Sequence, residues 1–234
     1  MNQAPAATGA HHGHPAAGVG HPVATRTWLF DLDNTLHNAT PHIFPHINRA
    51  MTAYIAQQLG LDEDAASRIR QDYWQRYGAT LLGLMRHHGT DPHHFLRETH
   101  HFPDLARLLV FEKPLRHALK RLPGRKLIFS NAPRRYTDAV LALTGLARYF
   151  DAVYSVENIK FQPKPMVAGF RTLLHAERLD PRRCIMVEDT LPNLLTAKRL
   201  GMATVLISRG TRQPAYVDVK LPSVCQLPRL YGRL

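Results

Sequence analysis

The chain has 234 residues, 44% hydrophobic and 21% charged, a balance typical of a globular protein and not of a disordered or collagen-like one. Its two cysteines exclude a disulfide framework and a four-cysteine zinc site, and no apolar run is long enough to cross a membrane. The 30 Lys and Arg residues exceed the 18 Asp and Glu residues and give a net charge of +12, which is compatible with binding nucleic acid, an anionic membrane or small anionic substrates.

Residues 1–25 consist mainly of Ala, Gly, Pro, His and Thr, with almost no large apolar side chain. Such a segment cannot bury enough surface to offset its ordering entropy, so we predict a disordered tail. Its histidines, His11, His12, His14 and His21, are interpreted as an incidental solvated tract in preference to a metal site. The segment lacks the basic stretch and apolar core of a secretory signal, so a reducing, cytoplasmic location is expected.

Short apolar runs further along the chain predict buried strands. They lie at 28–30, 126–129, 184–187 and 204–207, with a weaker run at 152–154. Helical apolar patterns separate the later runs, at about 136–146, 167–174 and 194–200. Strands that alternate with helices predict an α/β fold, in which a doubly wound parallel sheet is covered on both faces.

The interval between the first two predicted strands is roughly ninety residues long, far more than one crossover helix needs. It contains no strand-like run, but helical patterns cover about 43–60, 66–77, 80–88 and 92–100. We therefore predict an all-helical domain at about 40–113, inserted into a core formed by 26–39 and 114–212. The segment 213–234 is interrupted by prolines and is expected to be a tail of mostly loop.

Polar side chains follow several of the predicted strands at the point where each strand ends. They are Asp31 and Asp33 after the first strand, Ser130 and Asn131 after the run at 126–129, and Glu188 and Asp189 after the run at 184–187. The carboxyl ends of parallel strands meet at one edge, where open α/β folds bind ligands, so we expect these side chains to converge. Lys164, which lies between two prolines before another helix, could reach the same edge.

This set of residue types indicates phosphoryl transfer. Clustered carboxylates repel one another unless a cation lies among them, and an all-oxygen ligand set suits Mg²⁺. A lysine, a hydroxyl and backbone N–H groups at a helix start suit a phosphate. One carboxylate can then be the nucleophile, while a second exchanges a proton with the leaving group and with water. Each motif alone also has an ordinary explanation as a turn, a helix cap or a surface pair, and their order and shared placement favour the functional one.

The segment Phe30–Leu36 resembles the first signature of the haloacid dehalogenase superfamily. Ser130 resembles the second signature, Lys164 the third, and Glu188–Asp189 followed by Asn193 the fourth, in the right order. The resemblance spans about residues 26–210, and the helical insert is similar to the C1-type cap of that superfamily. It implies a Rossmann-like core, Mg²⁺ dependence and an aspartyl-phosphate mechanism.

The resemblance also implies roles for the matching residues. Asp31 would be the nucleophile and a metal ligand. Asp33 would be the acid and base, and its backbone carbonyl would contact the metal. Ser130, Asn131 and Lys164 would hold the phosphoryl group.

Asp189 would complete the metal site, with Glu188 as a helper or a direct ligand. The presence of Asp33 argues against dehalogenation, because a departing halide needs no proton. A phosphonatase would need a lysine in the cap, and the predicted cap has only Lys113, at its edge. The resemblance therefore implies a phosphatase that acts on a small phosphorylated metabolite.

The cap offers weaker indications of the substrate. Residues 73–78, and the helix that carries Asn48 and Met51, resemble the pyrimidine 5′-nucleotidase branch. This resemblance makes Asn48, Arg49 and Tyr77 candidate substrate residues. Aromatic residues at helical spacing are, however, more often part of a core. A phosphatase or mutase acting on sugar phosphates or other small phosphometabolites is the alternative. A non-catalytic nucleic-acid-binding protein is a remote one, because no helix-turn-helix, zinc-finger or RNP pattern is present. We expect neither a nucleic acid polymer nor a membrane as partner.

Overall fold

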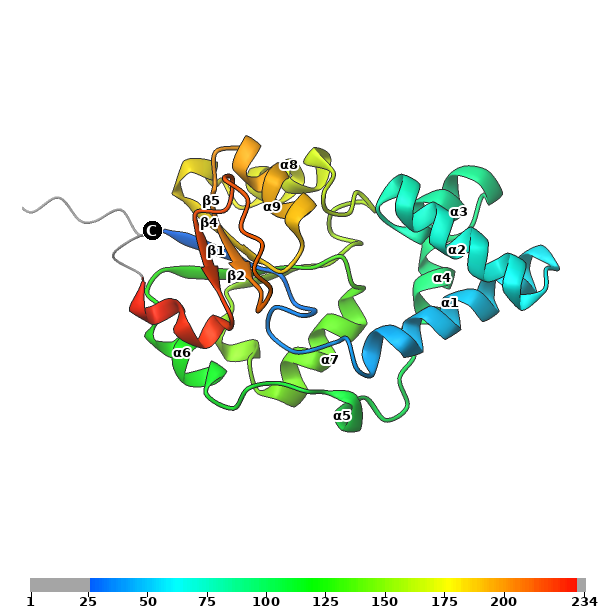
Figure 1. Cartoon of the computed structure of the whole chain (residues 1–234), viewed down its shortest axis with the longest axis horizontal. Coiled ribbons are helices and arrows are strands. Elements are labelled where there is room, and N and C mark those ends of the chain that lie inside the picture. Colours follow the sequence, from blue (N-terminus) through cyan, green and yellow to red (C-terminus); the bar gives the residue numbers. More distant parts are fainter. Residues whose placement is uncertain (1–25, 231–234) are drawn as a thin grey trace, which may run out of the picture.

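A parallel sheet of six strands forms the centre of the computed structural model, which describes residues 26–230 (Figure 1). The strands are β1 (Thr27–Phe30), β2 (Arg125–Phe129), β3 (Ala152–Tyr154), β4 (Cys184–Glu188), β5 (Ala203–Ile207) and β6 (Val219–Leu221), in the order β3-β2-β1-β4-β5-β6. Strand β1 pairs with both β2 and β4, so that Phe30 lies beside Ile128 on one side and Val187 on the other. The carboxyl ends of these three strands therefore meet at one edge of the sheet.

Both faces of the sheet are covered, as the continuous apolar runs predict. Trp28 and Phe30 of β1 belong to the core on one face, where α6 (Leu115–Arg121) and α7 (Arg134–Thr144) pack. Leu29 belongs to the core on the other face, beneath α8 (Val167–Ala176) and α9 (Leu191–Arg199). Figure 1 shows the two helix pairs on opposite sides of the strands. The predicted doubly wound α/β fold is confirmed.

Helices α1 (Ile43–Leu59), α2 (Glu63–Tyr77), α3 (Thr80–His88) and α4 (Pro92–Thr99) stand beside the sheet, followed by the short α5 (Leu105–Leu108) (Figure 1). Helices α1 to α4 share a separate core that includes Tyr54, Ile55, Leu84 and Phe95. The Asp62 side chain accepts a hydrogen bond from the Ala65 N–H and so caps α2, and Gly78 ends that helix with φ of 77°. The boundaries of an inserted domain at residues 40 and 113 stay a prediction.

The segment after Gln213 differs from the mostly loop structure expected. It contains β6 and a 3₁₀ helix, η3 (Val224–Arg229), whose Val224 and Leu227 are buried in the core. Two more 3₁₀ turns are η1 (Ala147–Tyr149) and η2 (Pro181–Arg183). Strand β6 has only three residues, too few to show a periodic pattern in the sequence. Its parallel pairing with β5 makes it a strand of the sheet, which the sequence did not indicate.

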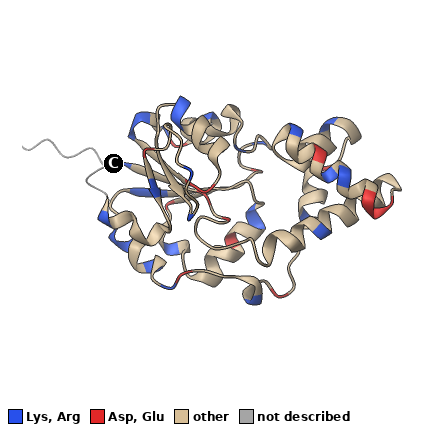
Figure 2. Ribbon diagram, viewed as in Figure 1, with Lys and Arg blue, Asp and Glu red and all other residues tan. Residues whose placement is uncertain are grey.

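The histidine-rich segment 1–25 lies outside the described residues, so its predicted disorder is not addressed. Within residues 26–230, no helix is both long enough and apolar enough to span a membrane. Figure 2 shows Lys and Arg spread over the helices of both parts of the molecule instead of gathered on one face.

Candidate active site

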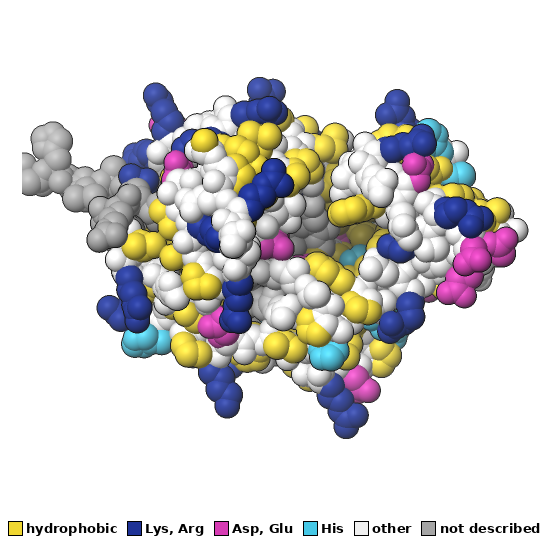
Figure 3. Space-filling view, viewed as in Figure 1, with side chains coloured by type: hydrophobic (Ala, Val, Ile, Leu, Met, Phe, Trp, Pro, Cys, Tyr) yellow, Lys and Arg dark blue, Asp and Glu magenta, His cyan; other side chains and the backbone are white. Residues whose placement is uncertain are grey.

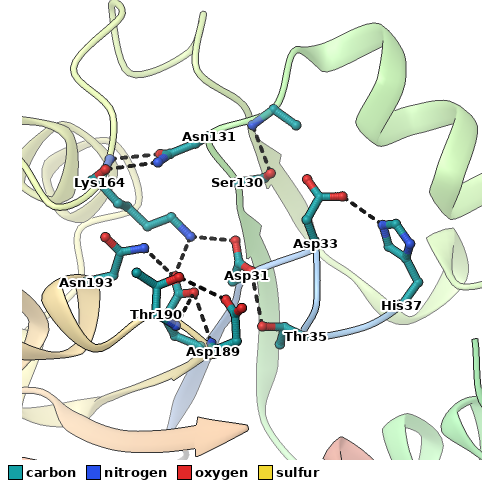
Figure 4. A network of polar contacts seen from close by, with 12 residues as sticks. Asp31, Asp33, Thr35, His37, Ser130, Asn131, Lys164, Asp189, Thr190 and Asn193 are labelled. Carbon is teal, nitrogen blue, oxygen red and sulfur yellow. Dashed lines mark hydrogen bonds and ion pairs between the residues drawn. The ribbon is translucent and has the colours of Figure 1, made fainter. Parts of the chain in front are cut away.

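Three carboxylates gather where β1 and β4 end. The side chains of Asp31, Glu188 and Asp189 each bring an oxygen within 4.8 Å of the others. Asp31 follows β1 directly, and its backbone N–H continues the sheet ladder to the Val187 carbonyl at 3.0 Å. The parallel register thus produces the convergence that the sequence predicts for these residues (Figure 4).

Lys164 lies among the carboxylates and is 2% exposed. Its Nζ donates to Asp31 Oδ1 at 2.7 Å and to Glu188 Oε2 at 2.8 Å. Burial alone would lower the pKa of Lys164, but the charges of Asp31 and Glu188 outweigh burial and hold it above its ordinary value. The side chain is therefore a fixed ammonium at the edge of the sheet.

Asn131 fixes the backbone around Lys164. Its side-chain nitrogen donates to the Lys164 carbonyl at 2.9 Å, and its side-chain oxygen accepts from the Lys164 N–H at 2.8 Å. The Asn131 side chain thus holds the backbone of the loop before α8, a structural role that the sequence did not indicate. The neighbouring Ser130 is buried, and its hydroxyl oxygen accepts from the Ala132 N–H at 3.0 Å. A direct phosphate contact by Ser130 or Asn131 stays a prediction.

Glu188 already has a full set of hydrogen-bond donors. Oε1 accepts from the backbone N–H groups of Asp189 and Thr190, and Oε2 accepts from Lys164 and from the Asn193 amide. An ionised carboxylate offers about four acceptor positions, so these donors occupy its capacity. Burial opposes ionisation, yet Lys164 and the other donors lower the pKa of Glu188. Of the two roles predicted for Glu188, this geometry favours that of a helper.

Asp31 and Asp189 carry surplus negative charge. Burial and the charge of Glu188 raise the pKa of Asp31 to about 7. Burial and the charge of Asp31 raise the pKa of Asp189 to about 9. One ammonium does not compensate three neighbouring carboxylates, and an all-oxygen donor set of this kind suits a hard divalent cation such as Mg²⁺. The residues present therefore fit the metal site that the sequence predicts.

Asp33 faces away from this cluster (Figure 4). Its Oδ1 accepts from the Tyr136 hydroxyl at 2.7 Å and lies 2.8 Å from His37 Nε2. Asn34 turns the chain here with φ of 61°, a conformation that asparagine tolerates, and its side chain accepts from the Ala39 N–H at 2.9 Å.

Sequence reasoning did not identify Tyr136 and His37 as neighbours of the site. His37 follows Asp33 by four residues, a spacing at which the two side chains can meet. Tyr136 is the first residue of a predicted helix, and no local signal connects it with Asp33. Thr35, which completes the first motif, donates its hydroxyl to Asp31 Oδ2 at 3.1 Å.

The structure does not bring the candidate substrate residues of the helical part to the carboxylates. Asn48 accepts from Arg70 at 3.0 Å, and the Tyr77 hydroxyl lies 2.6 Å from His87 Nε2. Arg49 is exposed on α1. Among the described residues, no hydrogen bond or ion pair joins these three to the strand ends, and their contact with substrate stays a prediction.

A family model for haloacid dehalogenase-like hydrolases matches residues 25–201. The chain is 26% identical over 200 residues to phosphate metabolism protein 8 of Saccharomyces cerevisiae, with 78% of this chain and 61% of that protein covered. It thus spans less than two thirds of that relative. The fructose-1-phosphate phosphatase YqaB of Escherichia coli is 28% identical, with 76% of this chain and 93% of that protein covered.

A 5′-nucleotidase of Pseudomonas aeruginosa is 25% identical, with 78% of this chain and 82% of that protein covered. Among solved structures, a haloacid dehalogenase-type phosphatase of Thermococcus onnurineus superposes with a TM-score of 0.62 at 23% identity. The superposition covers 88% of this chain and 98% of that one, and it shows that the two share a fold.

Proposed function

The chain belongs to the haloacid dehalogenase-like hydrolases, and from this premise we propose that it is a Mg²⁺-dependent phosphomonoesterase acting through an aspartyl-phosphate on Asp31. The observation that best supports the proposal is the buried Lys164, whose ammonium lies 2.7 Å from Asp31 at the edge where Asp189 also lies. A nucleophilic carboxylate, a fixed cation and a second carboxylate with surplus charge are what phosphoryl transfer requires.

In the proposed first step, an oxygen of Asp31 forms a bond to phosphorus, and the bond from phosphorus to the leaving-group oxygen breaks. Asp33 donates its proton to that oxygen. In the second step, Asp33 takes a proton from water, the water oxygen bonds to phosphorus, and the acyl phosphate on Asp31 breaks. Lys164 offsets the charge on the phosphoryl group in both steps.

A bound Mg²⁺, held by Asp31, Asp189 and the backbone carbonyl of Asp33, would neutralise charge on the transferring group. Ser130 and Asn131 would add a hydroxyl and a backbone N–H toward its oxygens. Glu188, with its donors in place, would keep Lys164 and the Asp189–Thr190 backbone in position.

The proposed substrates are small phosphorylated metabolites. Nucleoside 5′-monophosphates, pyrimidine ones in particular, are supported by the motif at residues 73–78 and by the 5′-nucleotidase relative. Sugar phosphates are supported by the fructose-1-phosphate phosphatase relative. Cys184 and Cys225 are both free thiols, which fits the proposed cytoplasmic location.

A screen of phosphomonoesters with Mg²⁺ or with EDTA tests the proposal. We expect hydrolysis with Mg²⁺, no hydrolysis with EDTA, and loss of turnover in Asp31→Asn. A phosphorylated protein trapped from the wild type and absent from Asp31→Asn would identify the intermediate. Full turnover by Asp31→Asn would contradict the proposed mechanism. Uniformly poor nucleotide turnover beside a fast sugar phosphate would overturn the nucleotide assignment.

A further inference from the structure

Aromatic rings enclose Tyr136, the residue whose hydroxyl donates to Asp33 Oδ1 at 2.7 Å. The ring centre of Phe102 lies 5.3 Å from that of Tyr136, with 37° between the ring planes. The ring centre of His100 lies 6.0 Å from that of Tyr136 in an edge-on arrangement. Both separations fall within the range of about 4.5–7 Å at which aromatic pairs attract each other. Tyr136 is 2% exposed, so its ring can shift only if these neighbours shift with it.

Phe102 is in turn contacted by α1, the first helix of the helical part. The ring centre of His46 on α1 lies 4.5 Å from that of Phe102. His46 Nε2 lies 2.8 Å from the carbonyl oxygen of His101, the residue before Phe102. A carbonyl oxygen can only accept a hydrogen bond, so Nε2 of His46 donates here. His46 therefore contacts both the Phe102 ring and the backbone beside it.

These contacts bridge the two parts of the molecule. Phe102 lies in the connection from α4 to α5, which passes the start of α1 (Figure 1). Its ring also packs against the core on the face of the sheet that α6 and α7 cover. Figure 3 shows the surface hollowed between the helical part and the sheet part. His46 and Phe102 are thus side chains that connect the two parts across their junction.

The position of the Tyr136 hydroxyl depends on the tilt of its ring. The hydroxyl is the atom of the side chain farthest from the backbone, so a small rotation of the ring moves it more than any other atom. A hydrogen bond weakens steeply when its donor leaves the favoured distance and direction. A Phe102 ring that is held by His46 limits the tilt of Tyr136 and so preserves the contact with Asp33.

We propose that Phe102 and His46 are positioning residues for Asp33 and act on it through the hydroxyl of Tyr136. They hold that hydroxyl on Oδ1, so that the other carboxyl oxygen of Asp33 keeps the orientation in which it protonates the leaving group. The inference rests on the proposed function, since it requires Asp33 to be the acid of that reaction. It assigns a role in the reaction to two residues that lie outside every strand-end motif.

Two kinds of phosphate ester test the proposal. The leaving group of p-nitrophenyl phosphate needs little protonation, whereas that of an alkyl phosphate, such as a nucleoside 5′-monophosphate or a sugar phosphate, needs a proton to depart. The measured quantity is the ratio of kcat/KM for the alkyl ester to kcat/KM for p-nitrophenyl phosphate, in which the amount of folded protein cancels. In Phe102→Leu we expect this ratio to fall about tenfold, because a misplacement of well under 1 Å is costly at a reacting group.

A double variant separates positioning from general packing. In Tyr136→Phe the hydroxyl is absent, so Phe102 has nothing left to position. We therefore expect Phe102→Leu to lower the ratio in the wild type but hardly at all in the Tyr136→Phe background. Two independent losses would instead multiply. A merely structural role for Phe102 would lower both esters alike and leave the ratio unchanged.

His46 and a matched control complete the set of variants. His46→Leu loses the donor to the His101 carbonyl, and we expect the ratio to fall about threefold, the size of one neutral hydrogen bond. His46→Gln retains an N–H donor and should lose less. Phe150 is half-buried against the same core as Phe102, and its ring lies 5.7 Å from that of Phe30. Phe150→Leu should therefore keep the wild-type ratio, and thermal melts verify that each variant is folded.

The outcomes distinguish this inference from the proposed function. If Asp33→Asn lowers the ratio but Phe102→Leu does not, or if Phe102→Leu acts equally with and without the Tyr136 hydroxyl, the positioning inference is wrong and the phosphatase proposal stands. If Asp33→Asn keeps the wild-type ratio, Asp33 is not the acid, and the inference fails with that step of the mechanism. If no phosphate ester of any kind is hydrolysed, both proposals fail.

Discussion

Tyr136 donates its hydroxyl to Asp33 Oδ1 at 2.7 Å, although the two residues are 103 positions apart in the chain. His37 Nε2 lies 2.8 Å from the same oxygen. Both rings are buried, so neither ring can swing away without repacking its surroundings. The two contacts hold one oxygen of the proposed acid in place and leave Oδ2 to exchange the proton.

Tyr136→Phe should therefore slow the step in which the leaving group is protonated. A hydrogen bond to a charged group contributes about 1.5–3 kcal/mol, so we expect kcat for an alkyl phosphate to fall roughly tenfold to a hundredfold. Hydrolysis of p-nitrophenyl phosphate, whose leaving group needs little protonation, should fall much less. Steady-state kinetics on both esters measure the difference, and an equal loss on the two would indicate a purely structural role for Tyr136.

The sheet and its functional edge could be predicted because both depend on local patterns. Short apolar runs indicate strands, and parallel pairing places the residues that follow those strands at one edge of the sheet. The sequence therefore predicted correctly that Asp31 and Glu188 lie close together. The contacts of Asn131 with the Lys164 backbone and of Tyr136 with Asp33 depend on how separate loops and helices pack. No periodic pattern in the sequence indicates such packing, so these two contacts could be found only in the folded structure.

Lys164 should be the residue whose removal alone is most costly at the site. Lys164→Met would leave Asp31 and Glu188 buried without their cation, and breaking a buried ion pair in this way costs about 3–5 kcal/mol. Urea unfolding should show this loss, together with loss of phosphatase activity. In the double variant Lys164→Met/Glu188→Gln, one buried charge fewer is left uncompensated, so we expect part of the stability to return. A Lys164→Met protein as stable as the wild type would contradict this assignment.

Gly83 allows α3 to pack closely against α2. A Cβ at this position would lie 2.2 Å from Cγ and 2.6 Å from Cβ of Tyr73, and that Cβ is bonded to the helix backbone and cannot move alone. Helix propensity by itself would make Gly83→Ala stabilising by about 1 kcal/mol, whereas overpacking costs about 1–3 kcal/mol. We expect the clash to prevail and the unfolding midpoint in urea to fall. A stabilised Gly83→Ala would show that α3 is free to shift.

The raised pKa values of Asp31 and Asp189 predict how pH and Mg²⁺ together control stability. Each carboxyl has an ordinary pKa of 3.8, and in the folded, metal-free protein the values are about 7 and about 9. The folded state thus binds protons that the unfolded state releases. The contribution of these two groups to stability without metal should therefore be greatest at low pH and fall between about pH 4 and pH 9.

Mg²⁺ should act in the opposite direction, because it binds the deprotonated carboxylates and competes with these protons. The rise in melting temperature on replacing EDTA by saturating Mg²⁺ should consequently grow as pH increases from 5 to 9. Asp189→Asn removes a proposed ligand and, of the two carboxyls, the one with the larger pKa shift. Both the pH dependence in EDTA and the stabilisation by Mg²⁺ should therefore shrink. Asp138→Asn, which loses only an exposed pair with Arg134, provides the matched control. A stabilisation by Mg²⁺ that is independent of pH, or that persists in Asp189→Asn, would place the metal elsewhere than at these carboxylates.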